Sequence, residues 1–306
     1  GVIEQKVLRK WKGNLIGGYR QIGSDIFAGT RTGEAVSLSS DGSVIAVGAP
    51  YEGGTRGQVR IYQYGSDNWN QVGRDINGEY DGDRFGYRLS LSSDGSVVAI
   101  SAFTNMGAGE NSGHVRVYKN ESGTWTQIGS DIDGEAAGDE SGWSVSLSGD
   151  GTVVAIGAIL NDDNGQDSGH VRVFENDSGT WTQIGSDIYG EASGDHFGDS
   201  VSLSNDGSVV AIGAPYNVAN GIDSGHVRIY QRIGNSWSQI GNGIAGEASV
   251  NFSGSSVSLS DDGTIVAIGA NEPRISGFPN ESGYVQVYQN IAGSWTQVGS
   301  DIDGNA

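Results

Sequence analysis

Residues 197–244, FGDSVSLSNDGSVVAIGAPYNVANGIDSGHVRIYQRIGNSWSQIGNGI, contain the pattern that decides the fold. At the start of this stretch Val201 and Leu203 alternate with serines, which is the period of a β-strand with one apolar face. The dipeptide Asp206-Gly207 follows directly and favours a tight hairpin, because both residues tolerate positive φ. The opening third of the stretch therefore predicts a strand and a turn.

The rest of the stretch predicts three more strands. Residues 209–214 are almost continuously apolar, as expected for a strand that is covered on both faces. After a variable loop, alternating segments begin at His226 and at Trp237, with the turn RIGNS between them. These signals together predict one four-stranded antiparallel sheet, and the chain shows no comparable stretch of helical apolar spacing.

The same sheet pattern recurs along the chain. The Asp-Gly turn is found at Asp41, Asp94, Asp150, Asp206 and Asp262, at intervals of 53, 56, 56 and 56 residues. A tryptophan recurs at Trp69, Trp125, Trp181, Trp237 and Trp295, at intervals of 56, 56, 56 and 58 residues. Two independent markers with one period define five repeats, at approximately 27–76, 77–132, 133–188, 189–244 and 245–302.

Five four-stranded sheets predict an all-β fold, a β-propeller that forms a single domain over residues 1–306. A single sheet cannot bury both of its apolar faces, whereas sheets stacked around an axis can. The fourth-strand pattern occurs a sixth time at residues 19–26, so residues 1–26 predict an extra N-terminal outer hairpin. This hairpin could cover the ring, form part of an incomplete sixth blade, or pair with the edge of a neighbouring molecule and cause self-association. The chain could also be a fragment of a longer array.

Two short motifs resemble the FG-GAP repeat. The FG motif is present at Phe85-Gly86 and at Phe197-Gly198, and Gly-Ala-Pro is present at 48–50 and 213–215. The resemblance covers nearly the whole chain, although some copies have diverged. It implies a propeller similar to that of integrin α-subunits and of related extracellular proteins. The calcium loop that this family often has between the first two strands of a blade is replaced here by short Asp-Gly turns.

Composition and charge exclude several classes of function. The chain has 306 residues with no cysteine, so disulfides and thiolate metal sites are excluded. It also has no apolar run long enough to span a membrane. The net charge of −20 makes nucleic acid a poor partner, because phosphates repel such a surface. Cations, basic proteins and neutral sugars remain compatible with this charge.

Acidic side chains gather in the loops that are expected on one face of the propeller. Oxygen-rich loops of this kind suit calcium, so we expect a possible Ca²⁺ site among these residues. The candidate ligands are Glu79, Asp83, Glu135, Asp139, Glu191, Asp195, Asp163 and Asp167. The alternative is that the carboxylates are solvated, or that they cap backbone amides and fix the turns between blades.

The five repeated tryptophans have two interpretations. Lectin propellers use aromatic platforms between blades, which makes Trp69, Trp125, Trp181, Trp237 and Trp295 candidate ligand-binding residues for a glycan. The alternative is that each indole packs against the next blade and has only a structural role.

The sequence gives little support for catalysis. It contains no nucleophile elbow and no HExxH motif, and three of its four histidines occupy one repeated position. Only His196, Trp143 and Arg88 depart from the repeat, and these are the places where we would look for an active site. We therefore expect that the chain is not an enzyme.

Four N-x-Ser sequons, headed by Asn120, Asn176, Asn251 and Asn280, permit glycosylation of a secreted protein. Together with the FG-GAP resemblance they favour an extracellular or cell-surface location. The leading hypothesis is an adhesion or binding module that recognises a protein or glycan through its acidic loop face. The alternatives are an enzyme that acts on polysaccharide and a structural subunit of a surface or filamentous assembly.

Overall fold

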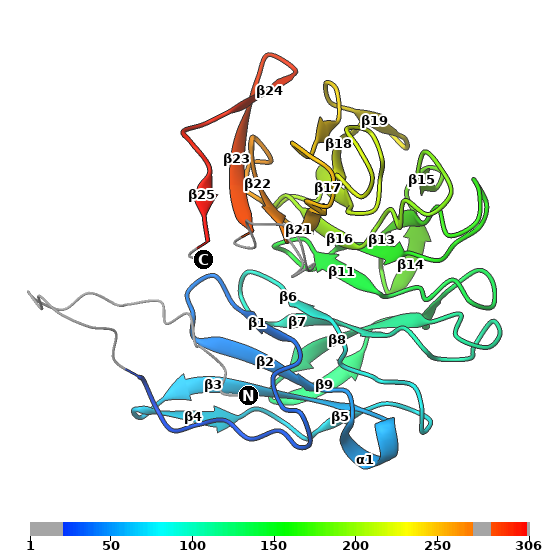
Figure 1. Cartoon of the computed structure of the whole chain (residues 1–306). Helices are drawn as coiled ribbons and strands as arrows, with labels where there is room; N and C mark the ends of the chain where they lie inside the picture. Colours follow the sequence, from blue (N-terminus) through cyan, green and yellow to red (C-terminus); the bar gives the residue numbers. More distant parts are fainter. Residues whose placement is uncertain (1–20, 272–282, 305–306) are drawn as a thin grey trace, which may run out of the picture.

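The computed structural model describes residues 21–271 and 283–304, which form five antiparallel sheets. In Figure 1 these sheets follow one another around the molecule in chain order, from the blue first sheet to the red fifth sheet. Each sheet has four strands plus one short additional strand. The predicted all-β propeller with five four-stranded blades is thereby confirmed.

The blades have closely similar strands. Blade 1 contains β1 (Val36–Leu38), β2 (Val44–Ala49), the helical turn α1 (Glu52–Thr55), β3 (Gln58–Gly65), β4 (Asn68–Gln71) and β5 (Ile76–Asn77). Blade 2 contains β6 (Leu89–Leu91), β7 (Val97–Ala102), β8 (His114–Glu121), β9 (Thr124–Gln127) and β10 (Ile132–Asp133). Blade 3 contains β11 (Ser144–Leu147), β12 (Val153–Ala158), β13 (His170–Asp177), β14 (Thr180–Gln183) and β15 (Ile188–Tyr189). Blade 4 contains β16 (Ser200–Leu203), β17 (Val209–Ala214), β18 (His226–Arg232), β19 (Trp237–Gln239) and β20 (Ile244–Ala245). Blade 5 contains β21 (Ser253–Leu259), β22 (Ile265–Ala270), β23 (Tyr284–Ile291), β24 (Ser294–Gln297) and β25 (Ile302–Asp303).

The outer strand of each blade differs from the prediction, because it is divided in two. In blade 4, β19 pairs with the end of β18, where Arg232 faces Trp237, and β20 pairs with its start, where Val227 faces Ile244. Between them Gly241 has φ +67°, a conformation that ends a regular strand. The chain therefore leaves the edge of the sheet and returns to it, which places the next inter-blade loop close to the start of β18.

The Asp-Gly turns are held by their own side chains. In blade 4 the Ser208 amide donates to Asp206 Oδ1 at 2.9 Å, and the Ser204 hydroxyl donates to the same oxygen at 2.7 Å. The turns also link neighbouring blades, since the Gly149 amide donates to the Asn205 carbonyl at 2.7 Å. The predicted hairpins are present, and they fasten successive blades together at one end of the first strands.

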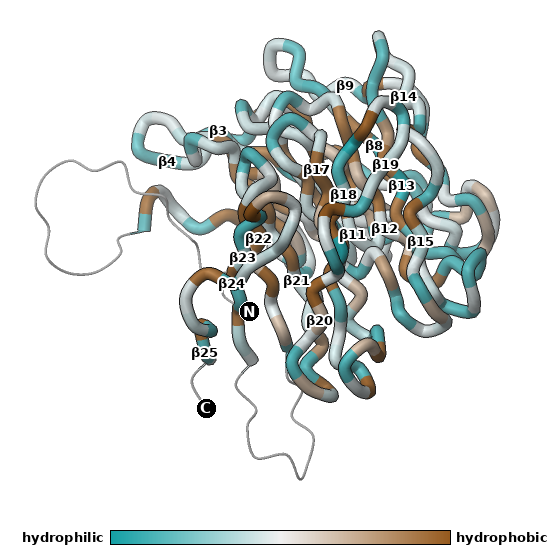
Figure 2. The backbone as a smooth tube through the Cα atoms, turned by 90° about the horizontal axis from the view of Figure 1, so that it is seen from above, coloured by the Kyte–Doolittle hydropathy of each residue, from teal (hydrophilic) through white to brown (hydrophobic). Residues whose placement is uncertain are grey.

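The apolar core lies between the blades. Ile61 of blade 1 packs in one buried cluster with Val98, Ile100 and Tyr118 of blade 2, and the equivalent clusters recur between the later blades. The brown apolar segments in Figure 2 follow the strands in the interior of the molecule. Each sheet thus buries its apolar faces against its neighbours, as the repeat argument requires.

The two signature motifs meet across the blade boundary. A Cβ atom on Gly213, the glycine of the Gly-Ala-Pro motif, would lie 2.1 Å from the Gly254 carbonyl oxygen of the next blade. Gly48 and Gly86 have the same relationship, at 2.2 Å, and so have Gly157 and Gly198, at 2.1 Å. These glycines are required because the backbones of adjacent blades approach too closely for any side chain.

The two ends of the blade series are more exposed than its middle. Val36 of β1 is 46% exposed, and Ile265 and Ile302 of blade 5 are 38% and 62% exposed. Against blade 1, the Ile22 carbonyl accepts a hydrogen bond from Trp69 Nε1 at 3.2 Å. The N-terminal segment 21–26 thus takes the place of a preceding outer strand, although its residues form no strand. The rest of the predicted hairpin, residues 1–20, lies outside the described residues.

Candidate functional site

The turn before the first strand has the same backbone conformation in each blade but different side chains. Its first position is occupied by Arg31, Arg84, Glu140, His196 and Phe252, all with φ between +50° and +56°. Its fourth position is occupied by Glu34, Tyr87, Trp143, Asp199 and Ser255. The backbone hydrogen bond across this turn, from the fourth amide to the first carbonyl, is 3.0–3.1 Å long in the last four blades. A constant scaffold therefore presents ten largely different side chains at one end of the first strands.

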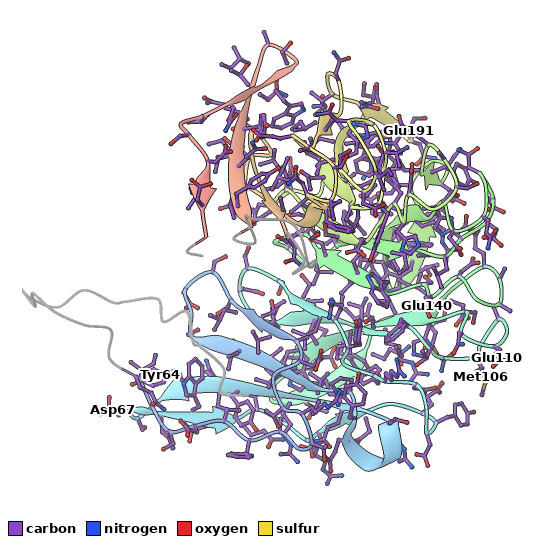
Figure 3. The ribbon with its side chains drawn as sticks, in the orientation of Figure 1. Tyr64, Asp67, Met106, Glu110, Glu140 and Glu191 are labelled. Atoms are coloured by element: carbon purple, nitrogen blue, oxygen red, sulfur yellow. The ribbon has the colours of Figure 1, made fainter. Side chains whose placement is uncertain are left out.

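These side chains lie near the propeller axis, because the first strands of successive blades contact one another. Figure 3 shows Glu140 on the turn that joins blade 2 to blade 3. We use the name axial cluster for the residues that contact one another there. Its members are Tyr87, Arg88, Phe103, Trp143, His196, Asp199 and Tyr216.

Aromatic rings form the greater part of the axial cluster. The Tyr87 ring lies 4.4 Å from Phe103 and 5.5 Å from Trp143, measured between ring centroids. On the other side the His196 ring lies 4.7 Å from Tyr216. The Arg88 guanidinium stacks over Tyr87 at 4.3 Å. Flat aromatic and guanidinium surfaces at one end of a propeller can stack against sugar rings or other planar ligands.

Asp199 is the acidic member of the axial cluster. Burial raises the pKa of its carboxyl above the ordinary value. The His196 imidazole, hydrogen bonding with Trp143 and the Arg88 guanidinium act in the opposite direction but do not cancel the effect of burial. Burial also raises the pKa of Glu140, against the influence of Arg84. Carboxyl groups with raised pKa values are candidates for proton transfer in catalysis.

The sequence singled out three of these residues: Trp143, which hydrogen bonds with Asp199, and His196 and Arg88, whose charges act on the Asp199 carboxyl. Asp199 itself could not be singled out from its own repeat, because it directly follows an FG motif. A comparison of the repeats position by position would have found it, since the equivalent residues are Tyr87 and Trp143.

The repeated tryptophans lie between the blades. Each indole Nε1 donates to a backbone carbonyl of the preceding segment, for example from Trp125 to Val72 at 3.0 Å and from Trp181 to Ile128 at 2.8 Å. Trp237 and Trp295 make the same contact at 3.0 Å, to Ile184 and Ile240. The indoles therefore pack on the preceding blade, not on the next one as the structural alternative had it.

Trp125 also borders an open groove of about 300 Å³ between blades 1 and 2. Gln63, Asp94 and Asn120 line this groove beside it. An indole next to polar side chains is the arrangement expected of a sugar platform, so glycan binding by the repeated tryptophans stays a prediction.

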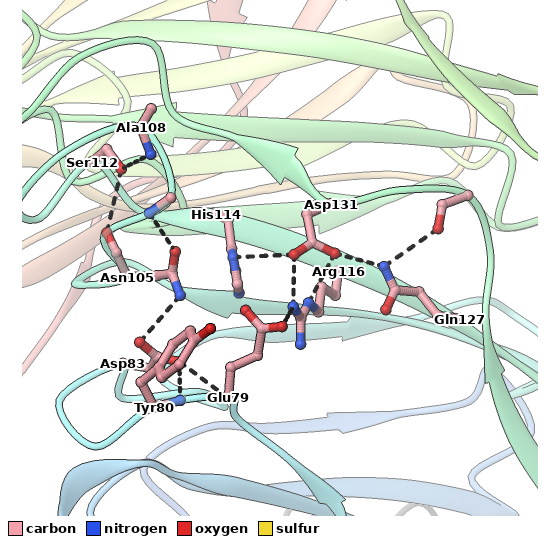
Figure 4. Close-up of polar contacts among 12 residues, drawn as sticks. Glu79, Tyr80, Asp83, Asn105, Ala108, Ser112, His114, Arg116, Gln127 and Asp131 are labelled. Atoms are coloured by element: carbon pink, nitrogen blue, oxygen red, sulfur yellow. Dashed lines mark hydrogen bonds and ion pairs between the residues drawn. The ribbon is translucent and has the colours of Figure 1, made fainter.

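The candidate calcium ligands divide into groups with different surroundings. Asp83, Asp139 and Asp195 are buried, and each accepts hydrogen bonds from backbone amides of its own loop and from an asparagine of the next loop. Glu79, Glu135 and Glu191 instead face an arginine on the following blade, at 2.5, 3.5 and 3.6 Å. Figure 4 shows this arrangement in blade 2, where Arg116 joins Glu79 to Asp131.

Asp163 and Asp167 lie in the loop between β12 and β13. The Asp167 amide donates to Asp162 Oδ1 at 2.8 Å, which holds this loop in a turn. Asp163 instead comes close to Glu135, together with two side chains that the sequence analysis did not propose as ligands, His170 and Asp187.

The asparagines of the described sequons differ in their exposure to solvent. Asn120 and Asn176 are partly exposed, and their Oδ1 atoms accept hydrogen bonds from the amides of Gly123 and Gly179. Asn251 is only 6% exposed, and its Oδ1 accepts from the Ala248 amide at 2.6 Å. Asn280 lies outside the described residues. Glycosylation at these asparagines stays a prediction.

The sheet arrangement and the axial cluster define the class of the protein, a five-bladed β-propeller with one diversified end. The FG-GAP repeat family matches residues 131–174 and 189–230, so blades 3 and 4 contain FG-GAP repeats, as predicted. No curated protein sequence matches the chain. Among the described residues, no helix is long and apolar enough to cross a membrane.

Solved structures with the same fold are similar at low sequence identity. TolB from Acinetobacter baumannii is 14% identical with a TM-score of 0.51, over 88% of this chain and 54% of TolB, so the chain spans about half of that protein's length. Hydrazine synthase from Kuenenia stuttgartiensis is 12% identical with a TM-score of 0.55, over 92% of this chain and 69% of the other. The periplasmic gluconolactonase of Pseudomonas aeruginosa is 16% identical with a TM-score of 0.56, over 87% and 70%.

The expectation that this chain is not an enzyme relied on the symmetry of its repeats, and it is wrong. The structures with the same fold include enzymes, among them the gluconolactonase. The physical reason is that repetition fixes the backbone only. Residues such as Asp199, at one end of the repeated strands, are free to differ and to form an active site.

Proposed function

We propose that the chain is a hydrolase that acts on a sugar or sugar-acid substrate at the axial cluster, with Asp199 as the proton-transfer group. The observation that supports this most directly is the partly buried Asp199 carboxyl, which hydrogen bonds with Trp143 and has a raised pKa under the influence of His196 and Arg88, at the diversified end of a repeated scaffold. A purely structural position would be expected to repeat its residue from blade to blade.

The aromatic members of the axial cluster suit a carbohydrate. The rings of Tyr87, Trp143 and Tyr216 offer flat apolar surfaces, which match the C–H faces of a pyranose or of a sugar lactone. The Arg88 guanidinium can donate hydrogen bonds to a carboxylate, a carbonyl or ring hydroxyl groups. The gluconolactonase acts on a substrate of this kind, and it shares the fold of this chain.

The chemistry proposed is hydrolysis at C1 of the sugar. The ionised Asp199 takes a proton from water as the water oxygen bonds to C1, and the C1–O bond to the leaving oxygen breaks. The proton then passes to that oxygen, so that one water is consumed for each bond cleaved. Arg88 is placed to stabilise negative charge that develops on the substrate oxygen.

A test is turnover by the purified protein on a panel of sugar lactones and polysaccharides, with Asp199→Asn as the variant. General acid–base catalysis contributes about 10²- to 10⁴-fold, so the variant should lose at least a hundredfold in rate. Asp177→Asn, at the exposed end of β13, serves as the matched control and should keep its rate. Equal rates in Asp199→Asn and the wild type, or no turnover on any member of the panel, would contradict the proposal.

The acidic loop face supports a second role, the binding of a protein or glycan partner outside the cytoplasm. The exposed carboxylates of Glu135 and Asp163 lie in loops on the same end of the propeller as the axial cluster, and the gluconolactonase that shares the fold is periplasmic. An extracellular or periplasmic location and partner recognition by this face are therefore part of the proposal. Self-association through the N-terminal hairpin remains a hypothesis, which light scattering at high protein concentration would test.

A further inference from the structure

Four side chains of metal-ligating type meet at the boundary between blades 2 and 3. Glu135 comes from the loop between β10 and β11, Asp163 from the loop between β12 and β13, and His170 is the first residue of β13. Asp187 directly precedes β15, the short strand that returns to the start of β13. One ligand atom of each residue lies within 4.8 Å of the ligand atoms of the others.

His170 points its free nitrogen into this group. The side chain is 1% exposed, and its Nδ1 has no hydrogen-bond partner. Nδ1 lies 3.7 Å from Asp187 Oδ2 and 3.8 Å from Glu135 Oε2, too far for hydrogen bonds. Two ligands of a tetrahedral zinc ion with bonds of about 2.1 Å are ~3.4 Å apart, so these atoms need to move only slightly to share one cation.

The equivalent position in blade 2 is satisfied by an arginine instead. There Arg116 binds both oxygens of Asp131 at 2.9 and 2.6 Å and contacts Glu79 at 2.5 Å (Figure 4). In blade 3 the matching Arg172 turns away, donates to the Asp133 carbonyl at 2.6 Å, and lies 3.5 Å from Glu135. In blade 3 the arginine therefore pairs only with Glu135, and at a longer distance, whereas in blade 2 it pairs with both Glu79 and Asp131.

Among blades 2, 3 and 4, blade 3 alone has all four of these ligand residues. The residue equivalent to Asp163 is Gly107 in blade 2 and Ala219 in blade 4, and the residue equivalent to Asp187 in blade 4 is Gly243. His114 and His226 keep the histidine in both neighbours. In blade 4 the equivalent Arg228 turns to the Tyr189 carbonyl in the same way, but two of the four ligand positions there hold Ala219 and Gly243.

The electrostatics of the site accompany this geometry. Burial and, to a smaller extent, the Arg172 guanidinium lower the pKa of His170 to about 4. Burial raises the pKa of Glu135, and the neighbouring Asp187 adds to this effect despite Arg172. The site thus brings three carboxyl groups to one imidazole, with Arg172 3.5 Å from Glu135.

We propose that Glu135, Asp163, His170 and Asp187 bind one divalent transition-metal cation of the Zn²⁺ class, which joins blade 2 to blade 3. One imidazole nitrogen with three carboxylates is a donor set for zinc or its first-row neighbours, whereas calcium prefers oxygen ligands alone. Tyr189 donates to Asp187 Oδ2 at 3.1 Å and orients that ligand from outside the site. The site shares no residue with the axial cluster and does not depend on the proposed hydrolase activity.

The test uses the purified chain freed of metal by dialysis and then titrated with Zn²⁺ in a calorimeter, with Ca²⁺ in a separate titration. His170→Gln is a suitable variant because blade 1 has Gln58 at the equivalent position, so the fold already accommodates glutamine there. Asp163→Ala is suitable for the same reason, because blade 4 has Ala219 at the equivalent position. The matched control is His114→Gln in blade 2.

We expect one Zn²⁺ per wild-type chain, a loss of affinity of at least tenfold in His170→Gln and in Asp163→Ala, and no change in His114→Gln. Zinc should also raise the melting temperature of the wild type but not of His170→Gln, because binding to the folded chain stabilises it. The proposal is overturned if His170→Gln binds zinc like the wild type, if the wild type binds none, or if Ca²⁺ is preferred independently of His170.

Discussion

The amide of Leu203 in blade 4 donates a hydrogen bond of 3.0 Å to the hydroxyl oxygen of Ser146 in blade 3. The same contact joins Leu147 to Ser90 and Leu259 to Ser202, also at 3.0 Å. The alternating serines of the first strands thus have a structural role. They satisfy backbone amides of the following blade and set its register along the axis.

Ser146→Ala should therefore destabilise the propeller. The substitution leaves the Leu203 amide without its partner in a part-buried setting, which costs about 1–3 kcal/mol. Chemical denaturation of the two proteins measures the difference. Ser178→Ala, in the exposed turn after β13, is the control and should change the free energy of unfolding by less than about 0.5 kcal/mol.

The contact between the two signature glycines gives a second prediction. A methyl group at Gly213 would overlap the Gly254 carbonyl, so Gly213→Ala must push blade 4 away from blade 5. We expect a loss of about 3 kcal/mol or more, at the upper end of overpacking effects. The free energy of unfolding from urea titration tests this.

The control for the glycine prediction is Gly65→Ala. No atom lies within 4 Å of a Cβ built on Gly65, and its φ is not positive. That variant should be nearly as stable as the wild type. If Gly213→Ala were equally well tolerated, the close approach of the two blades would be wrong.

The Asp-Gly turns predict a loss of stability in acid. Hydrogen bonds from Ser260 and Thr264 lower the pKa of Asp262 to about 2. A carboxyl whose pKa is lower in the folded than in the unfolded chain stabilises the fold above its unfolded value, here 3.8, and this contribution is lost as the pH falls toward 2. Asp262→Ala should therefore melt earlier than the wild type at neutral pH, and the difference should shrink as the pH approaches 2. A difference that persists at pH 2 would show that the carboxylate charge is not the cause.

Asp199 should have the opposite effect on stability. Because its pKa is raised in the folded chain, ionisation of this carboxyl at neutral pH opposes folding. Asp199→Asn should therefore have a higher melting temperature than the wild type near pH 7, and the advantage should vanish once the pH is low enough to protonate Asp199. Scanning calorimetry over this pH range is the measurement. An Asn variant that melts lower at neutral pH would indicate that the carboxylate is a structural ligand.

The repeated parts of the molecule could be predicted from the sequence. The alternation of valine with serine, the Asp-Gly turns and the 56-residue period are local signals, and together they define the strands and the five blades. The division of the outer strand was missed, because nothing in the segment WSQIGNGI except Gly241 indicates that the chain leaves the sheet.

The candidate sites were harder to predict, because they depend on contacts between blades. His170 looks like one of three equivalent histidines until the structure shows Glu135, Asp163 and Asp187 around it. Asp199 lies in a repeat that otherwise follows the pattern, and its significance depends on Trp143 and Arg88 of other blades. Distances between repeats are not encoded in the period, so burial and charge balance at these positions could not be deduced from the sequence.

The pH dependence of hydrolysis tests the central claim most directly. Once a substrate from the lactone and polysaccharide panel is found, the rate should rise with pH through a group whose pKa is above the ordinary value of about 3.8 for aspartate. In Asp199→Asn this rise should be absent and the remaining rate at least a hundredfold lower. A profile with the same inflection in the variant would contradict the assignment of Asp199 and with it the account of the axial cluster.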